Sequence, residues 1–393
     1  MTAPVRDAEP ERAARVPAAD HPSRALRPAL TELRLSSFAA HRKAVVRMGP
    51  VTYLAGPSGS GKSTVLRAAE ALARLGGGAR LVEAFPDPPA CVPDREGPRA
   101  GRRGFRIGCG AEGPAGPVRL VLAVQTEPDL RIVGERLTAG GLTLLQTGLR
   151  DPARRVVEAA WHTGGSAPLT RGPLPDDRLG TPLLPLRVAG RTDGQRLVLA
   201  AAEQMVVALR SVFACDPCPS AMRRPAPRGG GRLLSGCGNL AEVLRRTGAE
   251  CGRRHARLVA AARAGCAGPV RDLTTRQLDD GTVCALLDRG DGILTPVDRL
   301  GDGELRYLAL ALVLLTGPGV LEVDTAAEVP AAYQTLTVLA DGFDRCLDDR
   351  QLRELTGLAA EMCAGGHLRL LAAVRTTTAA QGAAPASVVH LKP

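Results

Sequence analysis

The residues between Val51 and Thr64 combine glycine, lysine and hydroxyl side chains in a spacing that suits phosphate chemistry. A short apolar run leads directly into Gly56-x-x-x-x-Gly61-Lys62-Ser63. Glycines let the backbone turn so that its N–H groups point at phosphate oxygens, and a following helix directs its positive end at the same place. In this pattern the lysine pairs with the β- and γ-phosphates, and the serine ligates Mg²⁺. It predicts a nucleoside triphosphate site made of Gly56, Pro57, Ser58, Gly59, Ser60, Gly61, Lys62, Ser63 and Thr64.

Lys62 is one of only three lysines in a chain with 51 basic residues. Arginine stands at nearly every other basic position, so a lysine here indicates a chemical requirement. A compact ammonium fits against phosphate oxygens in a tight loop, whereas a planar guanidinium does not. The composition therefore supports the interpretation of this segment as a phosphate-binding loop.

A carboxylate is expected beside this loop, because the Mg²⁺ that accompanies a triphosphate takes an acidic ligand from the end of a neighbouring strand. Two apolar runs end in aspartate, Thr337–Asp341 and Val320–Asp324. The second run carries a charge in its middle, so Asp341 is preferred. The sequence predicts Ser63 and Asp341 as magnesium ligands, with Asp324 as the alternative. A structural role for Asp341, capping a turn, is also open.

Strand-like and helix-like segments alternate at both ends of the chain, which predicts an α/β fold with a mainly parallel core sheet. Short strands separated by turn residues predict an antiparallel strand meander beside it. Apolar residues at helical spacing predict an inserted, mostly helical lobe. Strands are expected at 30–38, 44–54, 118–124, 130–137, 142–146, 336–340, 368–374 and 387–391. Helices are expected at 62–75, 195–213, 239–246, 250–263, 304–315 and 349–363, and loops at 84–116 and 164–190.

Composition divides the chain into four parts. Residues 1–29 are rich in Pro, Ala, Arg and Asp without periodicity, as in a disordered tail. Residues 30–160 hold the phosphate-binding loop and the antiparallel strands, and residues 161–290 form the inserted lobe. Residues 291–393 complete the core with a second set of strands and helices.

Positive charge is concentrated in the inserted lobe. The segment from Arg210 to Asp272 holds twelve basic and four acidic residues, in a chain with a net charge of +11. Its loop Ala221–Arg232 alone holds four arginines. Such charge suits nucleic acid phosphates, whereas the few aromatic residues of the chain argue against stacking on single-stranded bases. DNA is therefore a candidate partner, and the alternative is a solvated arginine-rich loop.

No feature of the sequence predicts export or membrane insertion. Residues 1–30 lack the apolar segment of a secretory signal, and the longest apolar run is too short to span a bilayer. The ten cysteines are scattered mostly singly, as in a reduced cytoplasmic protein. Cys215 and Cys218 have the spacing of zinc ligands, but two incidental cysteines are favoured because no second such pair follows. We expect a cytoplasmic protein without membrane contact.

The run Leu300-Gly301-Asp302-Gly303-Glu304, followed directly by a helix-like segment, resembles the signature motif of ABC-type ATPases. The segment from Leu33 through the phosphate-binding loop is similar to the start of SMC-, RecF- and OLD-like ATPases. Leu347-Asp348 matches the D-loop of this group. The resemblance covers about residues 30–76 and 295–375.

This resemblance implies an ATPase head that binds ATP and Mg²⁺. In the family, two heads form a dimer around two nucleotides, and the signature of one head contacts the γ-phosphate held by the other. It therefore implies a homodimer that forms on ATP binding and couples the nucleotide state to DNA or to a protein partner, in DNA maintenance or defence. Without the resemblance, the segment Leu300–Glu304 is a turn that caps a core helix.

Several positions depart from the family pattern. Gly342 stands where the catalytic glutamate follows the magnesium aspartate, and glycine cannot polarise water. Asp344 lies nearby and is the candidate catalytic acid together with Asp341. Arg375 stands where the family has a histidine after the last strand, and Gly301 where it has a serine.

The Q-loop glutamine of the family has no assigned counterpart. Gln125 is the residue considered for it, but a strand-surface residue is the favoured interpretation. With these departures, two functions remain open. One is an ATPase of the ABC/SMC type. The other is a nucleotide-sensing regulatory or scaffold switch with little or no hydrolysis.

Overall fold

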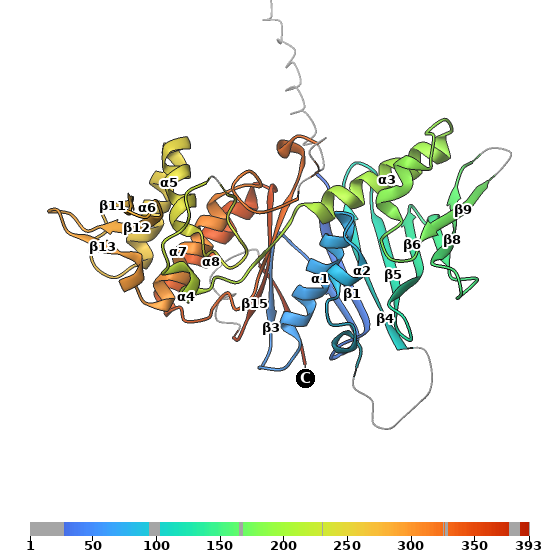
Figure 1. Cartoon of the computed structure of the whole chain (residues 1–393), viewed down its shortest axis with the longest axis horizontal. Helices are drawn as coiled ribbons and strands as arrows, with labels where there is room; N and C mark the ends of the chain where they lie inside the picture. Colours follow the sequence, from blue (N-terminus) through green and yellow to red (C-terminus); the bar gives the residue numbers. More distant parts are fainter. Residues whose placement is uncertain are drawn as a thin grey trace, which may run out of the picture.

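The computed structural model describes residues 27–93, 103–164, 168–229, 231–324, 326, 329–376 and 386–392. A central sheet is flanked by a broad antiparallel sheet on one side and by a mixed lobe on the other (Figure 1). The tail expected over residues 1–29 lies outside the described residues up to residue 26. Ala29 already belongs to the first strand.

The central sheet carries the phosphate-binding loop. Its five strands have the order β10-β14-β15-β3-β16, and every neighbouring pair is parallel. β3 and β14 are buried along their whole length, as strands covered on both faces must be. The strands are β3 (Val51–Ala55), β10 (Val212–Cys215), β14 (Leu336–Ala340), β15 (Leu368–Val374) and β16 (Ala386–His390). The covering helices are α1 (Lys62–Gly76), α7 (Asp302–Leu315) and α8 (Asp349–Ala364).

Side chains of the central sheet alternate between two hydrophobic cores. Tyr53 packs in the core that contains α7 and α8, whereas Leu54 packs in the core that contains α1 and the antiparallel sheet. Leu370 and Leu371 of β15 divide in the same way. This alternation follows from the two-residue period of a strand. Packing on both faces fixes the ends of β3, β14 and β15 relative to one another.

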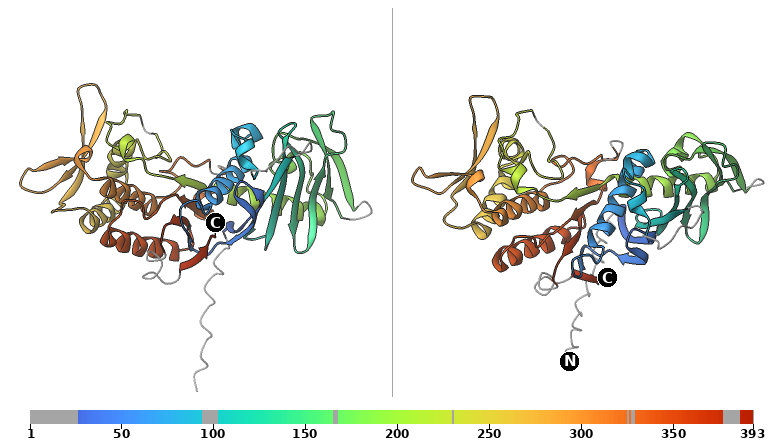
Figure 2. Two further views of the ribbon diagram at one scale, coloured as in Figure 1. Left: turned by 90° about the horizontal axis from the view of Figure 1, so that it is seen from below. Right: turned by 60° about the horizontal axis from the view of Figure 1, so that its bottom comes forward.

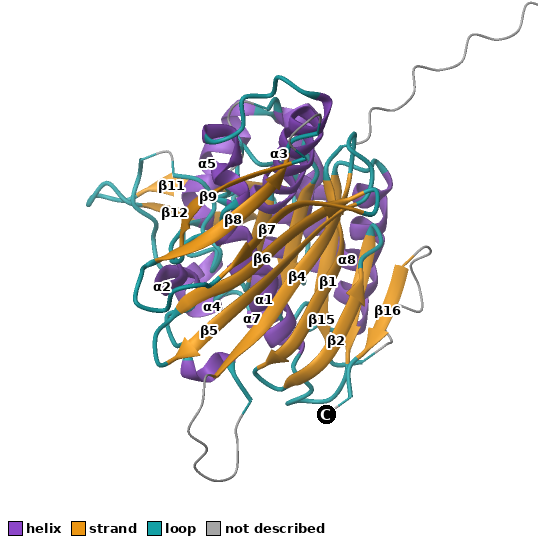
Figure 3. Cartoon of the chain, turned by 90° about the vertical axis from the view of Figure 1, so that its right-hand side faces the viewer, coloured by secondary structure: helices purple, strands orange, loops and turns teal. Residues whose placement is uncertain are grey.

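The antiparallel sheet has eight strands in the order β2-β1-β4-β5-β6-β7-β8-β9 and forms the broad face seen in Figure 3. α1 and α3 pack against its other face. The predicted meander is confirmed as β5, β6 and β7. The bounds are β1 (Ala29–Phe38), β2 (His41–Arg47), β4 (Arg103–Glu112), β5 (Val118–Glu127), β6 (Arg131–Ala139), β7 (Leu142–Gly148), β8 (Val156–His162), β9 (Leu169–Pro175) and α3 (Asp193–Arg210).

Two loop predictions are wrong, because the segments contain strands. β4 lies within residues 84–116, and β9 lies within residues 164–190. The glycines that make β4 look like a loop stand where the neighbouring strand comes close. A Cβ on Gly108 would lie 2.5 Å from the carbonyl oxygen of Leu120. Glycine here permits a close approach between backbones and does not break the strand.

Two other elements differ in extent. The strand expected over residues 44–54 is divided at Gly49-Pro50 into β2 and β3, which belong to different sheets. The helix expected over residues 195–213 ends at Arg210, and Val212 begins β10. The residues of β10, among them Val212 and Phe213, pair with β14. Pairing between strands therefore overrides the helical pattern at the C-terminal end of the predicted helix.

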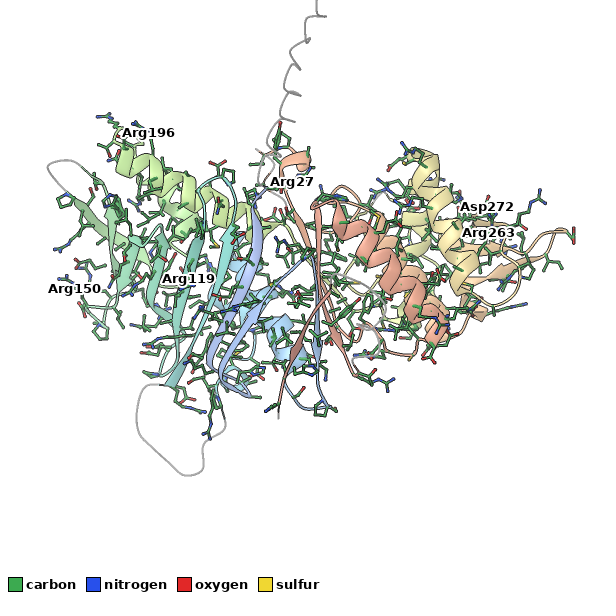
Figure 4. The ribbon with its side chains drawn as sticks, turned by 180° about the vertical axis from the view of Figure 1, so that it is seen from behind. Arg27, Arg119, Arg150, Arg196, Arg263 and Asp272 are labelled. Atoms are coloured by element: carbon green, nitrogen blue, oxygen red, sulfur yellow. The ribbon has the colours of Figure 1, made fainter. Side chains whose placement is uncertain are left out.

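The lobe on the other side of the central sheet contains two helices and a small antiparallel sheet (Figure 2). Its elements are α5 (Leu240–Glu250), α6 (Gly252–Gly265), β11 (Asp272–Gln277), β12 (Val283–Asp288) and β13 (Leu294–Pro296). Both predicted helices are confirmed. Arg263 and Asp272 lie on this lobe, far from Arg119 and Arg150 of the antiparallel sheet (Figure 4). The division of the chain into four parts stays a prediction.

Short helical segments complete the connections. They are α2 (Leu81–Ala84), α4 (Pro219–Met222) and the 3₁₀ turns Pro89–Cys91, Thr181–Leu186, Val297–Arg299 and Ala331–Tyr333. Among the helices of the described residues, none combines the length and the apolar character needed to cross a bilayer.

Candidate nucleotide site

The phosphate-binding loop connects β3 to α1. Gly59 and Gly61 have φ angles of +82° and +83°, in the left-handed region that favours glycine. A Cβ on Gly61 would also collide with the ring of His41, whose Nε2 lies 3.0 Å from the Gly61 carbonyl oxygen. In the described structure, α1 starts at Lys62 without a side-chain cap and without an acid in its first turn. The first N–H groups of this helix are therefore open to an anion.

Lys62 lies folded over the loop. Its Nζ donates to the carbonyl oxygens of Gly56 at 2.6 Å and Pro57 at 2.8 Å. The Ser60 hydroxyl is buried and has no hydrogen-bond partner within the described residues. An ammonium group and an unpartnered hydroxyl beside a helix N-terminus are groups that phosphate oxygens can satisfy.

The loop forms one wall of a cavity of about 460 Å³. The other walls are made by residues that follow β14 and by the end of β15. Ligands of α/β proteins bind at this carboxyl edge of a parallel sheet. Every predicted loop residue except the buried Ser60 lines the cavity, together with Asp341, Gly342, Asp344, Arg345 and Arg375.

Ser63 and Asp341, the predicted magnesium ligands, both line this cavity. Asp341 directly follows the buried strand β14. A hydroxyl and a carboxylate are hard oxygen donors of the kind that Mg²⁺ takes in triphosphate sites. The donor set therefore fits the metal that the sequence implied.

Asp324, the alternative acid, lies elsewhere. Its Oδ1 pairs with Arg210 at 3.1 Å, and its Oδ2 would lie 3.0 Å from a Cβ on Gly77, just after the last residue of α1. The phosphate-binding loop is at the other end of this helix, about 20 Å away by the rise of an α-helix. The run before Asp324 forms no strand in the described residues, and Leu321 makes only a single bridge. Between the two acids, only Asp341 lies beside the loop.

Asp344 is the second acid of the cavity. Its side chain is 5% exposed, and its Oδ2 accepts a hydrogen bond from the backbone N–H of Arg375 at 2.8 Å. Its Oδ1 is buried and has no partner in the part of the chain that the structure describes. One oxygen of this carboxylate is therefore left for a water or a ligand.

The signature-like turn does not line this cavity. Gly301 precedes α7, and its N–H donates to Glu304 Oε2 at 3.1 Å. Arg223, from the arginine-rich loop, donates to the Leu300 carbonyl at 2.9 Å and to Asp302 Oδ1 at 2.6 Å. Gly301 and Asp302 are exposed in this turn, whereas Leu300 is buried, and the helix that follows is buried. Within one copy of the chain, it does not meet the phosphate-binding loop.

Arg306, which the sequence motifs do not include, connects this turn to the cavity edge. Its side chain is 2% exposed, and Nη1 pairs with Asp216 Oδ1 at 3.0 Å. Nη2 donates to the carbonyl oxygens of Asp341 at 3.0 Å and Gly342 at 2.9 Å. The available signal was one charged residue in the otherwise apolar run Leu305–Leu315, because a buried charge needs partners.

Gln125 and Asp348, which the family resemblance brought into question, both lie outside the cavity lining. Gln125 is buried on β5 and donates to the Asp129 carbonyl at 3.3 Å, so the strand-surface interpretation is wrong. It lines a separate cavity on the antiparallel sheet. Asp348 of the D-loop-like pair caps α8, because its Oδ1 accepts from the N–H of Gln351 at 2.7 Å.

The Cys215 and Cys218 thiols lie in different environments. Cys215 is buried, and a hydrogen bond with Cys237 together with burial raises its pKa well above the usual range. Cys218 is exposed and contacts Ser220 at 3.2 Å. Within the described residues, no group of three or more His, Cys, Asp or Glu side chains can hold a metal ion.

Comparison with solved structures finds a similar fold in SMC head domains. An SMC head bound to the C-winged helix domain of ScpA matches with a TM-score of 0.51 at 12% identity, over 90% of this chain and 92% of that chain. An SMC head derived from Pyrococcus furiosus, bound to the C-terminal domain of ScpA, gives 0.49 at 10% identity, over 93% and 94%. The fold is similar to that of SMC heads. No protein-family model and no curated protein matches the sequence, so the similarity is one of fold.

Proposed function

We propose that this chain is an ATP-binding head of the ABC/SMC type that pairs with a second copy around ATP. The observation that carries the proposal is the cavity that joins Lys62, Ser63 and Asp341. Lys62 and the start of α1 would hold the β- and γ-phosphates, and Ser63 and Asp341 would hold Mg²⁺. Bound ATP would supply the phosphoanhydride bond, while the residues of the chain would hold the triphosphate in place and balance its negative charge.

The turn Leu300–Glu304, with Gly301 and Asp302 exposed, supports pairing between copies. It lies away from the cavity of its own chain, and its backbone leads into the N-terminus of α7. The backbone N–H groups at the N-terminus of α7 can donate to a phosphate oxygen that approaches from outside. Asp302 and Glu304 stand in the same first turn, and Arg223 pairs with Asp302 there. In a pair, this turn would contact the γ-phosphate that the second copy holds, through the backbone N–H groups at the start of α7.

Two outcomes for bound ATP are supported by different residues. Asp344, whose buried Oδ1 has no partner in the described residues, supports slow hydrolysis, because a carboxylate can orient and deprotonate a water. Gly342 supports the second candidate, a nucleotide-sensing switch with little or no hydrolysis. Its φ is +56°, and the guanidinium of Arg345 lies against it, so a cation stands beside the position where hydrolytic relatives carry a carboxylate.

A partner would sense the nucleotide through α7. Arg306 ties this helix to the backbone of Asp341 and Gly342, so movement at the cavity edge reaches the exposed turn. DNA is one candidate partner, and a protein is the other. Within the described residues, the side chains of Arg224, Arg253 and Arg271 are exposed on the basic lobe without a hydrogen-bond partner, and they would contact phosphates.

One experiment follows binding and turnover in the same sample. Radiolabelled ATP with Mg²⁺ is incubated with the chain, and retained nucleotide and released phosphate are measured over hours, with and without duplex DNA. Phosphate release that Asp344→Asn abolishes, with retention unchanged, identifies an ATPase. Retained ATP that stays intact identifies the switch. The absence of retained nucleotide under all conditions contradicts both functions.

A further inference from the structure

We propose that Arg345 binds the terminal phosphate of ATP and makes the site prefer a triphosphate to a diphosphate. This inference rests on the proposed function and assigns a role to a residue that the phosphate-binding pattern does not include. It is carried by the packing of Arg345 against Gly342, by the charges of the cavity and by the anchor that holds the guanidinium.

The packing fixes where the guanidinium lies. A Cβ on Gly342 would stand 2.7 Å from Arg345 Nε and 2.8 Å from both Cζ and Nη2. Gly342 has a φ of +56°, which L-residues with a side chain rarely adopt. The missing side chain therefore leaves the space that Arg345 occupies. Arg345 comes from the turn after β14 and lines the same cavity as Lys62.

The charges of the cavity suit an anion. Lys62, Arg345 and Arg375 face two carboxylates, Asp341 and Asp344. Asp344 is engaged by the backbone of Arg375, and Asp341 is the proposed magnesium ligand. Arg345 adds a second cation to a cavity that Lys62 and the start of α1 also line, so a third phosphate bound there would have a basic partner besides Lys62.

The anchor leaves suitable donors free. Arg345 Nη1 donates to Asp216 Oδ1 at 3.3 Å, and Asp216 is itself held by the buried Arg306 at 3.0 Å. Nε and Nη2, which lie over Gly342, have no acceptor in the described part of the chain. A guanidinium can bind two oxygens of one phosphate with two parallel N–H groups. Arg345 therefore keeps its anchor while it presents a donor pair to the cavity.

The test compares affinities for ATP and ADP by calorimetry, with Mg²⁺, for the wild type, Arg345→Ala, Arg345→Lys and Arg353→Ala. Arg353 is exposed on α8 and outside the cavity, so its variant removes the same charge elsewhere. We expect Arg345→Ala to weaken ATP binding by about 10- to 100-fold, as for the loss of one charge-assisted contact, and to leave ADP binding within about 3-fold. Arg345→Lys should restore part of the preference, and Arg353→Ala should match the wild type.

Thermal unfolding of each variant separates this role from a structural one. If Arg345 only holds Asp216, Arg345→Ala lowers the melting temperature while the ratio of the ATP and ADP affinities stays that of the wild type, and the inference is overturned. An equal loss for both nucleotides overturns it as well. A wild-type chain that binds neither nucleotide contradicts the proposed function itself, and the two failures are thereby distinguished.

Discussion

Arg306 Nη2 donates to the carbonyl oxygen of Asp341 at 3.0 Å, and this contact joins the helix after the signature-like turn to the edge of the candidate nucleotide cavity. The same guanidinium holds Asp216 at the end of β10. Three segments that are distant in the sequence therefore meet at one buried cation. A buried arginine with several acceptors holds the segments that it connects in one arrangement.

Replacing Arg306 by methionine should destabilise the fold. The change leaves the carbonyl oxygens of Asp341 and Gly342 without their donor and breaks the pair with Asp216. We expect the free energy of unfolding to fall by about 2–4 kcal/mol, because buried acceptors lose their partner. Urea unfolding measures the change, with Arg353→Ala as the surface control. A loss below about 1 kcal/mol would show that the carbonyls find other donors.

ATP-dependent pairing should fail in Gly301→Arg. A Cβ on Gly301 meets only Glu304 Oε2 at 3.8 Å, so the arginine fits within its own chain and blocks the exposed turn. Gly303→Arg is unsuitable, because a Cβ there would collide with the carbonyl oxygen of Cys346. Gly317→Arg is the control, since a Cβ on Gly317 has open space and lies beyond the other end of α7.

Light scattering with and without ATP measures this effect. The wild type and Gly317→Arg should double in mass with ATP, while Gly301→Arg should remain a monomer with an unchanged melting temperature. Equal masses for the wild type with and without ATP, at every concentration tried, would contradict pairing through this turn.

Three exposed arginines of the basic lobe should set the salt dependence of DNA binding. The loop arginines are less suitable, because Arg223 holds the signature-like turn and Arg232 donates to the Val323 carbonyl at 2.8 Å. Changing Arg224, Arg253 and Arg271 together to serine should lower the slope of log affinity against log salt by up to about one unit per lost phosphate contact. Titration of labelled duplex DNA measures the slope. Absence of association at low salt would favour a protein partner.

Cys218 should be the thiol that reacts first with an alkylating reagent. Its hydrogen bond with Ser220 lowers its pKa, so its thiolate is present at a lower pH than in an ordinary exposed cysteine. Labelling by iodoacetamide should therefore stay fast as the pH falls towards neutral, and Cys218→Ser should remove this fast phase. Cys346, which is also exposed, offers the matched variant Cys346→Ser. Loss of the fast phase in that variant would assign it to Cys346.

The sequence predicted the parts of the fold that local patterns determine. The phosphate-binding loop, the apolar strands β14 and β15 and the helices around them carry strong signals of type and spacing. β4 was missed because its glycines serve a close approach to β5, and β10 was missed because it forms only by pairing with β14. Such contacts between distant segments leave little trace in a local window.

The candidate site also contains residues that local patterns predict and residues that only contacts between distant segments reveal. Lys62, Ser63 and Asp341 were identified from chemistry and position, and the structure brings them to one cavity. Arg306 and Arg345 were not identified as contacts of the cavity edge. Arg306 binds the carbonyl oxygen of Asp341, 35 positions along the chain, and Arg345 is anchored by Asp216, 129 positions away, so a local pattern does not reveal these contacts. The arginine-rich composition also hides them among many surface arginines.

The central claim, that the loop binds ATP, is tested most directly by calorimetric titration of ATP with Mg²⁺ into the wild type, Lys62→Ala and Lys43→Ala. Lys62 is the cation of the loop, whereas Lys43 is exposed on β2 and outside the cavity. We expect saturable binding by the wild type and Lys43→Ala, and a loss of at least about 100-fold in Lys62→Ala, as for the loss of a strong charge-assisted contact. The melting temperature of Lys62→Ala without nucleotide should equal that of the wild type. Unchanged ATP affinity in Lys62→Ala would contradict the account.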